Sequence, residues 1–128
     1  MVTTLRSFSG FSVDDVDAAR AFYRDTLGLP VRENAMGALE IDLTDGSSVF
    51  VYPKGEAHAP ASYTMLNLVV PDIDAAVTEL EAAGVSLIRY PGFDQDERGV
   101  ARSTDPAKGP TIGWIADPAG NVIALIED

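Results

Sequence analysis

The sequence predicts an α+β fold made of two tandem units, each a strand, a helix and three further strands. Its main support is a repeat, because Val13-Asp14-Asp15-Val16-Asp17-Ala18-Ala19 returns 57 positions later as Val70-Pro71-Asp72-Ile73-Asp74-Ala75-Ala76. Each copy follows a short apolar run and opens an amphipathic segment that closes on a glycine, Gly28 in the first and Gly84 in the second. Two copies of one strand-to-helix unit indicate a duplicated domain whose halves face each other.

The first unit is expected over about residues 5–54. Residues 5–13 form its first strand, and Asp14 or Asp15 caps the helix that follows. That helix buries a stripe at helical spacing and stops at Gly28, where a left-handed residue is favoured. Three strands are expected next, over residues 29–33, 38–43 and 48–52, the last two joined by a turn at Asp45-Gly46.

A linker of about residues 55–62, with prolines and the single histidine, leads to a second unit over about residues 63–127. Its first strand spans 63–70, and Pro71 with Asp72 starts a helix that ends before Gly84. Four more strand segments are expected, over residues 85–90, near 99–104, and over 112–116 and 121–126. A long polar loop over residues 91–110, which includes the segment near 99–104, separates the first of these strands from the last two.

The amino-acid composition excludes some classes of function and favours others. The 128 residues include no cysteine, so disulfides, thiolate metal sites and cysteine nucleophiles are excluded. The net charge of −11 repels nucleic acid, favours solubility and attracts cationic ligands. No apolar run is long enough for a membrane span and no secretory pattern opens the chain, so we expect no membrane partner and a cytoplasmic location.

Two segments carry a family resemblance. Ala21-Phe22-Tyr23-Arg24-Asp25-Thr26-Leu27-Gly28-Leu29 follows a strand that ends in aspartates, and Asp117-Pro118-Ala119-Gly120-Asn121 closes the second unit. The chain thereby resembles the vicinal oxygen chelate superfamily, which holds glyoxalase I, extradiol dioxygenases, fosfomycin-resistance enzymes and bleomycin-resistance proteins. The resemblance implies one domain over residues 1–128, with two βαβββ units that form cupped mixed sheets around a cleft, helices on the outer faces, and a homodimer.

The resemblance also bears on metal binding. In the superfamily's metalloenzymes, His, Glu and occasional Gln side chains hold one divalent ion, and the equivalent positions here fall on Phe8, Phe50, Met65 and Ala124. None offers an oxygen or imidazole nitrogen donor, and the Met65 thioether is soft. We therefore expect neither a metal ion nor another cofactor.

Alternation along the strands predicts which side chains face the cleft. The expected cleft face carries Phe8, Gly10, Glu40, Ser48, Phe50, Tyr52, Met65, Asn67, Ile112, Trp114 and Ala124. From these, the ligand-binding candidates are Phe8, Phe50, Tyr52, Met65, Asn67 and Trp114. The aromatic side chains could instead fill space or form a dimer interface, and the Asn67 amide requires a ligand or a backbone group as its partner.

Candidates for chemistry are few. Glu40 is either a pocket acid for proton transfer or a solvated strand carboxylate, and His58 is either an acid–base group or a surface residue of the linker. The run Phe93-Asp94-Gln95-Asp96-Glu97-Arg98 is either a lid or a solvated acidic loop.

We interpret the chain as a metal-independent small-molecule-binding protein of the glyoxalase/bleomycin-resistance type. Its ligand would be a hydrophobic or aromatic compound in an aromatic-lined cleft, and the acidic field would suit a cationic one. The alternative is a lyase, isomerase or dioxygenase-like enzyme of the same superfamily, either metal-free or with relocated metal ligands. Whether the protein is an enzyme stays open at this point.

Overall fold

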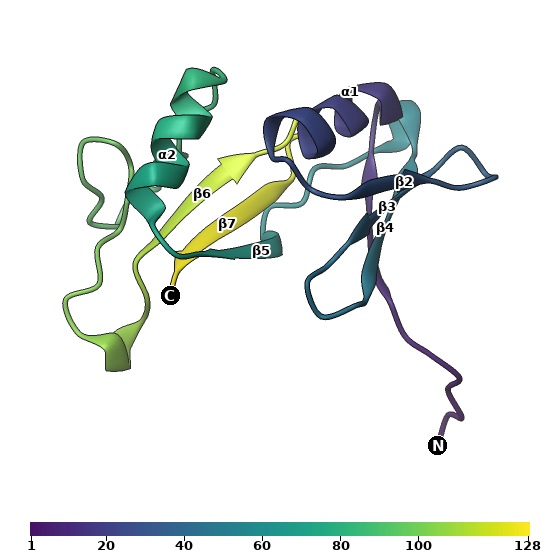
Figure 1. Cartoon of the computed structure of the whole chain (residues 1–128), viewed down its shortest axis with the longest axis horizontal. Coiled ribbons are helices and arrows are strands. Elements are labelled where there is room, and N and C mark those ends of the chain that lie inside the picture. Colours follow the sequence, from purple (N-terminus) through teal and green to yellow (C-terminus); the bar gives the residue numbers. More distant parts are fainter. The chain divides into compact units, whose positions relative to one another are not determined.

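A computed structural model describes residues 1–128 as two compact units, residues 1–60 and 61–128. Each unit contains one sheet and one principal helical segment (Figure 1). The α+β class that the repeat predicted is confirmed. No helix combines the length and apolar character needed to cross a bilayer.

The first unit is a four-stranded mixed sheet. Its strands are β1 (Ser9–Val13), β2 (Val31–Glu33), β3 (Leu39–Asp42) and β4 (Ser48–Pro53), in the spatial order β1-β4-β3-β2. β1 runs parallel to β4, and the other neighbours are antiparallel. A short 3₁₀ turn, η2 (Gly55–Ala57), follows β4.

The helical segment of the first unit begins where the sequence predicted and then widens. The Asp15 side chain accepts hydrogen bonds from the backbone N–H groups of Asp17 and Ala18, at 2.9 and 3.3 Å, and so caps α1 (Val16–Arg20). The segment continues as a π-helix, η1 (Ala21–Thr26), a widening that periodicity did not predict. Gly28 has a φ of 70°, which confirms the left-handed stop.

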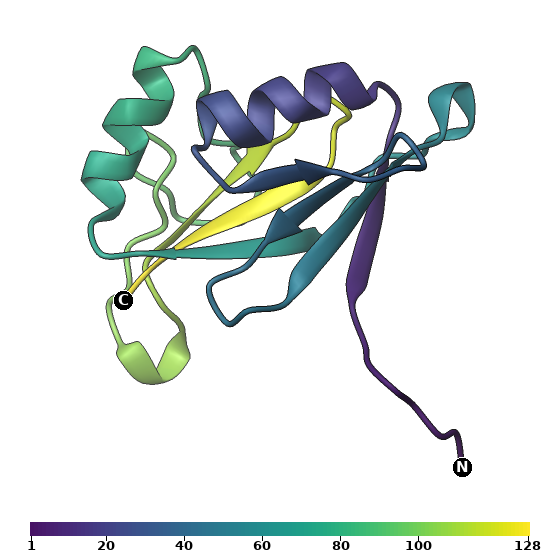
Figure 2. The ribbon, with the colours of Figure 1, turned by 45° about the vertical axis from the view of Figure 1, so that its right-hand side comes forward.

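The core of the first unit follows from strand alternation. The inward residues of the sheet are Phe11, Val13, Leu39, Ile41, Val49 and Val51, all buried. Tyr23, on η1, is fully buried and lies 5.7 Å from the ring of Phe11. The strand predicted from residue 5 begins at Ser9 instead, because the chain before it leaves the sheet (Figure 2) and Leu5 is 100% exposed.

The second unit is a three-stranded sheet covered by one helix. β5 (Thr64–Val70) runs parallel to β7 (Val122–Glu127), which pairs antiparallel with β6 (Ile112–Ala116). α2 (Ile73–Ala82) begins at its cap Asp72, whose side chain accepts from Ala75 N–H at 3.1 Å. The helix buries Ile73, Val77 and Leu80. The 3₁₀ turn η3 (Pro106–Lys108) precedes β6.

The turn between β6 and β7 is held by its first residue. Asp117 Oδ1 accepts from the backbone N–H groups of Ala119 and Asn121, each at 2.9 Å, and Gly120 N–H donates to the Asp117 carbonyl. The Asn121 side chain also accepts from Ala61 N–H at 3.0 Å. The aspartate that the sequence placed at the head of this turn therefore builds it.

Two predicted strands of the second unit are wrong. Residues 85–90 form no strand and make one backbone hydrogen bond to the sheet, from Ile88 N–H to the Trp114 carbonyl at 2.7 Å. Near residues 99–104 only an isolated bridge between Ala101 and Ile112 forms. The physical reason is the Gln95 side chain, which bonds the carbonyl of Ile88 and the N–H of Tyr90 in place of a neighbouring strand.

Candidate functional site

The sheet of the first unit has one face packed on its helix and one face turned away from it, which we call the open face. Pairing aligns Gly10, Phe50, Glu40 and Arg32 in one row across all four strands of the open face. Ser12 and Tyr52 form the next row. The structure thus brings Phe50, Tyr52 and Glu40 together on one surface, as alternation predicted.

Three rings on the open face form an aromatic ladder, made of Phe8, Phe50 and Tyr52. Phe50 stacks on Tyr52 with ring centroids 5.5 Å apart and planes 23° apart, and Phe8 meets the other side of Phe50 edge-on at 6.3 Å. Phe8 is 55% exposed and Tyr52 is 36% exposed. The Arg6 guanidinium lies 5.0 Å from the centre of the Phe8 ring. The ladder therefore presents a continuous apolar surface to solvent.

Gly10 leaves space beside Phe50, the central residue of the aromatic ladder. A methyl group at this position would lie 3.1 Å from the Phe50 carbonyl oxygen and 3.6 Å from the Phe50 Cβ. A larger residue would therefore crowd the strand that carries the central ring.

Charged groups flank the ladder on the side of β3 and β2. Arg32 donates to Asp42 from its Nε and from one terminal nitrogen, Nη2, the shortest distance being 2.7 Å, and these hydrogen bonds hold the pKa of Asp42 below its ordinary value. Glu40 lies 3.7 Å from Arg32. The carboxylate of Glu40 therefore belongs to an ion-paired cluster beside the aromatic ladder.

His58 comes back to the sheet from the end of the first unit. Its Nδ1 lies 2.8 Å from Ser12 Oγ, and both residues are half-buried. Because Ser12 pairs with Tyr52 across β1 and β4, this contact stands beside the ladder. The sequence identified His58 as a candidate but did not identify its serine partner, which lies 46 residues away.

In the second unit, Asn67, Ala124 and Trp114 form a row across the sheet. The Trp114 ring is half-buried and meets Tyr90 at 5.3 Å and Phe93 at 5.2 Å, both edge-on; we call these three residues the tryptophan cluster. Asn67 is exposed, so solvent can also bond its amide, and a ligand as its partner stays a prediction. The sequence missed Tyr90 and Phe93 as partners of Trp114.

Met65 lies at an irregularity in β5. Pairing with β7 skips from Thr64–Val122 to Leu66–Ile123, so β5 carries one extra residue at this point. A bulge interrupts alternation, and the face assigned to Met65 by counting along the strand therefore does not follow from the observed register.

The residues at the superfamily's metal positions do not suit a metal ion. Phe8 and Phe50 are parts of the ladder, Ala124 is fully buried, and none of the three has a donor atom on its side chain. Nowhere in residues 1–128 do three His, Cys, Asp or Glu side chains gather in an arrangement that could hold a metal ion.

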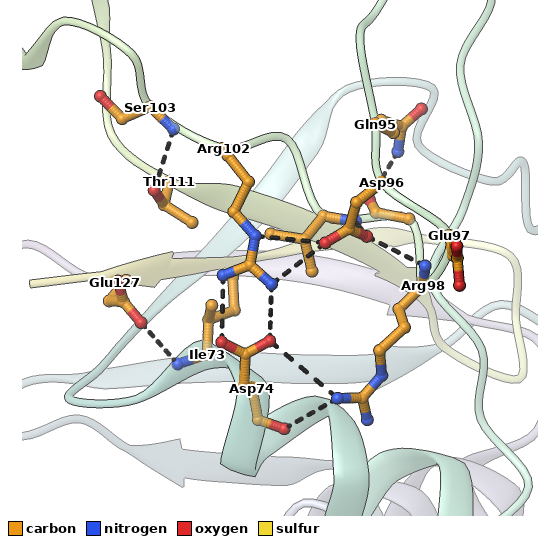
Figure 3. A network of polar contacts seen from close by, with 12 residues as sticks. Ile73, Asp74, Gln95, Asp96, Glu97, Arg98, Arg102, Ser103, Thr111 and Glu127 are labelled. Carbon is orange, nitrogen blue, oxygen red and sulfur yellow. Dashed lines mark hydrogen bonds and ion pairs between the residues drawn. The ribbon is translucent and has the colours of Figure 1, made fainter.

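The polar loop over residues 91–110 is anchored to the rest of the second unit by hydrogen bonds and ion pairs. Asp96 accepts from the backbone N–H groups of Arg98 and Val100, and Arg102 bridges Asp96 to Asp74 on α2 (Figure 3). Burial raises the pKa of Asp96, but the Val100 N–H and the Arg102 guanidinium outweigh it and hold that pKa below its ordinary value. The spacing Asp96-Glu97-Arg98-Gly99 is the sequence signal of this turn.

The family model of the Glyoxalase/Bleomycin resistance protein/Dioxygenase superfamily matches residues 7–125. Among solved structures, the chain is similar to TnmS3, described as an antibiotic binding protein from Streptomyces sp. CB03234, with 23% identity, TM-score 0.68, and 99% and 98% of the two chains covered. It is also similar to a superfamily member from Sphaerobacter thermophilus DSM 20745, with 22% identity, TM-score 0.69 and 98% of each chain covered. No curated protein matches the chain.

Proposed function

The chain belongs to the glyoxalase/bleomycin resistance protein/dioxygenase superfamily, and we propose that it is a metal-independent binder of a hydrophobic or aromatic small molecule. The aromatic ladder of Phe8, Phe50 and Tyr52 supports this proposal most directly. Exposed contiguous apolar surface on a soluble domain commonly marks a binding site. A flat ligand laid on the ladder would cover rings that otherwise face water.

The electrostatics of the chain suit a cationic ligand. The net charge of −11 attracts cations over distances of about a Debye length, ~10 Å at moderate salt. On the open face Arg32 is already paired with Asp42, so it adds little local repulsion. The solved neighbour described as an antibiotic binding protein has a similar fold and supports the binding of a small organic molecule.

A thermal-shift and titration screen tests the proposal. The metal-stripped protein would be heated with bleomycin, a planar cationic acridine dye, and divalent cations in separate wells. We expect the organic cations to raise the melting temperature, because a ligand that binds only the folded state stabilises it. A response to divalent cations alone would contradict the proposal and direct attention to a metalloenzyme.

The Ser12–His58 hydrogen bond favours a second candidate, a metal-free enzyme that uses His58 for proton transfer. Glu40, on the open face, would be a second group for proton transfer. Turnover of a carbonyl substrate by metal-free protein that disappears in His58→Ala or Glu40→Gln would support this candidate. Binding without turnover would support the binder.

The homodimer implied by the superfamily is part of the proposal, as is a cytoplasmic location. Light scattering after gel filtration would give twice the chain mass of 13.6 kDa for a dimer. If Phe50→Ala dissociated such a dimer without weakening ligand binding, the ladder would be the dimer interface and the binding proposal would fail.

A further inference from the structure

The tryptophan cluster is held by a segment that lacks regular structure. Tyr90 and Phe93 both lie outside the strands, yet their rings meet Trp114 at 5.3 and 5.2 Å. Phe93 N–H donates to the Tyr90 carbonyl at 3.2 Å, which turns the chain between the two rings. Phe93 is 57% exposed, so much of this residue remains open to solvent.

One side chain organises this segment. Gln95 Nε2 donates to the carbonyls of Ile88 and Gly99, at 2.8 and 2.7 Å, and Gln95 Oε1 accepts from Tyr90 N–H at 2.8 Å. Both amide hydrogens and the amide oxygen are thus bonded to backbone. Ile88 in turn donates its N–H to the Trp114 carbonyl, so Gln95 connects both ends of the segment to the strand that bears the tryptophan.

A second layer ties the segment to α2. Gly99 N–H donates to the Asp96 carbonyl at 3.0 Å, beside the Gln95 contact. Arg102 binds Asp74 at 2.6 and 3.0 Å and Asp96 at 3.0 and 3.1 Å, as Figure 3 shows. A swinging motion of residues 90–102 would have to break both layers together.

We propose that Gln95 is a positioning residue that makes the tryptophan cluster a preformed wall for planar aromatic ligands. The inference rests on the proposed function for the ligand class and deepens it, since it adds a surface of the second unit, in addition to the ladder residues of the first, to those that contact a planar aromatic compound. Gln95 acts through Tyr90 and Ile88 and need not touch the ligand. A preformed wall strengthens binding because its rings do not have to be ordered when the ligand binds. Planar aromatic ligands gain most because stacking on a ring requires a flat aromatic face.

The principal variant is Gln95→Met, which keeps the side-chain length and removes all amide hydrogen bonds. Its matched control is Asp94→Asn, an exposed neighbour in the same segment. A second variant, Arg102→Gln, loosens the outer layer, and Lys108→Gln removes one exposed positive charge elsewhere in the unit as its control. Melting curves of each variant establish the temperature range in which it is folded.

Two readouts are needed. The first is acrylamide quenching of Trp114 fluorescence in the ligand-free protein, which reports whether Tyr90 and Phe93 still cover the indole. The second is calorimetric titration with the planar acridine dye and with tetrabutylammonium, an aliphatic cation. Removing preorganisation should weaken the dye about three- to tenfold, the equivalent of immobilising one or two side chains on binding.

The expected result for Gln95→Met is stronger quenching, weaker dye binding and unchanged tetrabutylammonium binding, with a smaller change of the same kind for Arg102→Gln and none in the controls. Unchanged dye affinity in Gln95→Met would overturn the inference while leaving the binder intact. An equal loss for both cations would overturn it too, because Gln95 would then be merely structural. If the unaltered protein bound neither the dye nor any other aromatic probe, the proposed function itself would fail and the inference with it.

Discussion

Phe50 stacks on Tyr52 with ring centroids 5.5 Å apart and planes 23° apart. The two residues are separated by Val51 on β4, whose side chain is fully buried on the other face. Because side chains alternate along a strand, a buried valine between two aromatic residues places both rings on the open face. The stacking is therefore a direct product of the local sequence Phe50-Val51-Tyr52.

The first prediction concerns Gly10, which lies opposite Phe50. Gly10→Val should displace the Phe50 strand, because even a methyl group there would lie 3.1 Å from the Phe50 carbonyl oxygen. Overpacking of this kind costs about 1–3 kcal/mol. Urea unfolding followed by circular dichroism measures the change, with the exposed Ser9→Val as control. Equal urea midpoints for Gly10→Val and Ser9→Val would show that the sheet accommodates the larger side chain without loss of stability.

The second prediction concerns the helix cap Asp15. Asp15→Ala should destabilise the first unit by about 1 kcal/mol, because the N–H groups of Asp17 and Ala18 lose their acceptor. Asp15→Asn keeps an acceptor oxygen and should restore most of the loss. Thermal unfolding compares the three proteins, and an Asn variant as unstable as the Ala variant would speak against the capping role.

The sequence narrowed this cap to Asp14 or Asp15 and anticipated its counterpart Asp72, because an aspartate recurs at both strand-to-helix junctions. Alternation likewise assigned Phe50, Tyr52 and Glu40 to one face of the sheet. Regularly paired strands without a bulge keep successive side chains on opposite faces. Met65 escaped this logic because an extra residue in β5 breaks the period. The role of Gln95 could not be predicted either. Its side-chain amide takes the place of a neighbouring strand, and a single residue of this kind leaves no periodic pattern in the sequence.

The widening of the first helix was also beyond sequence reasoning. Leu27 N–H bonds the Phe22 carbonyl, five residues back, so the last turn is wider than an α-helical one. Phe22 and Tyr23 of this widened segment are both buried, and the Tyr23 ring lies 5.7 Å from the ring of Phe11 on β1. Contacts of this kind with another element leave no periodic signal in the sequence of the helix.

The third prediction concerns acid and the Arg102–Asp74 pair. Hydrogen bonds from Arg102 hold the pKa of Asp74 below its ordinary value, so the unfolded state binds the proton more readily. The stabilisation is present above the unfolded pKa, about 3.9, and is lost as the pH falls through the lower folded value. Melting temperatures of the unaltered protein should therefore fall more steeply below about pH 4 than those of Asp74→Asn. Parallel curves would contradict the linkage.

The fourth prediction concerns salt and the same pair. Arg102 and Asp74 are both partly exposed, so their attraction is screened by salt, with a Debye length of about 3 Å at 1 M. Raising sodium chloride to that concentration should increase acrylamide quenching of Trp114 slightly in the unaltered protein and leave Arg102→Gln unaffected. An identical response in both proteins would mean that the pair does not hold the segment.

The most direct test of the binding proposal is calorimetric titration of Phe50→Ala with the planar acridine dye. Met36→Ala is the matched control, because Met36 is a large exposed apolar side chain outside the open face. Loss of the central ring should weaken dye binding about tenfold or more, as expected for truncation of a buried aromatic contact worth 1.4 kcal/mol or above. The control should bind as the unaltered protein does. Equal affinity of Phe50→Ala and the unaltered protein would contradict the account.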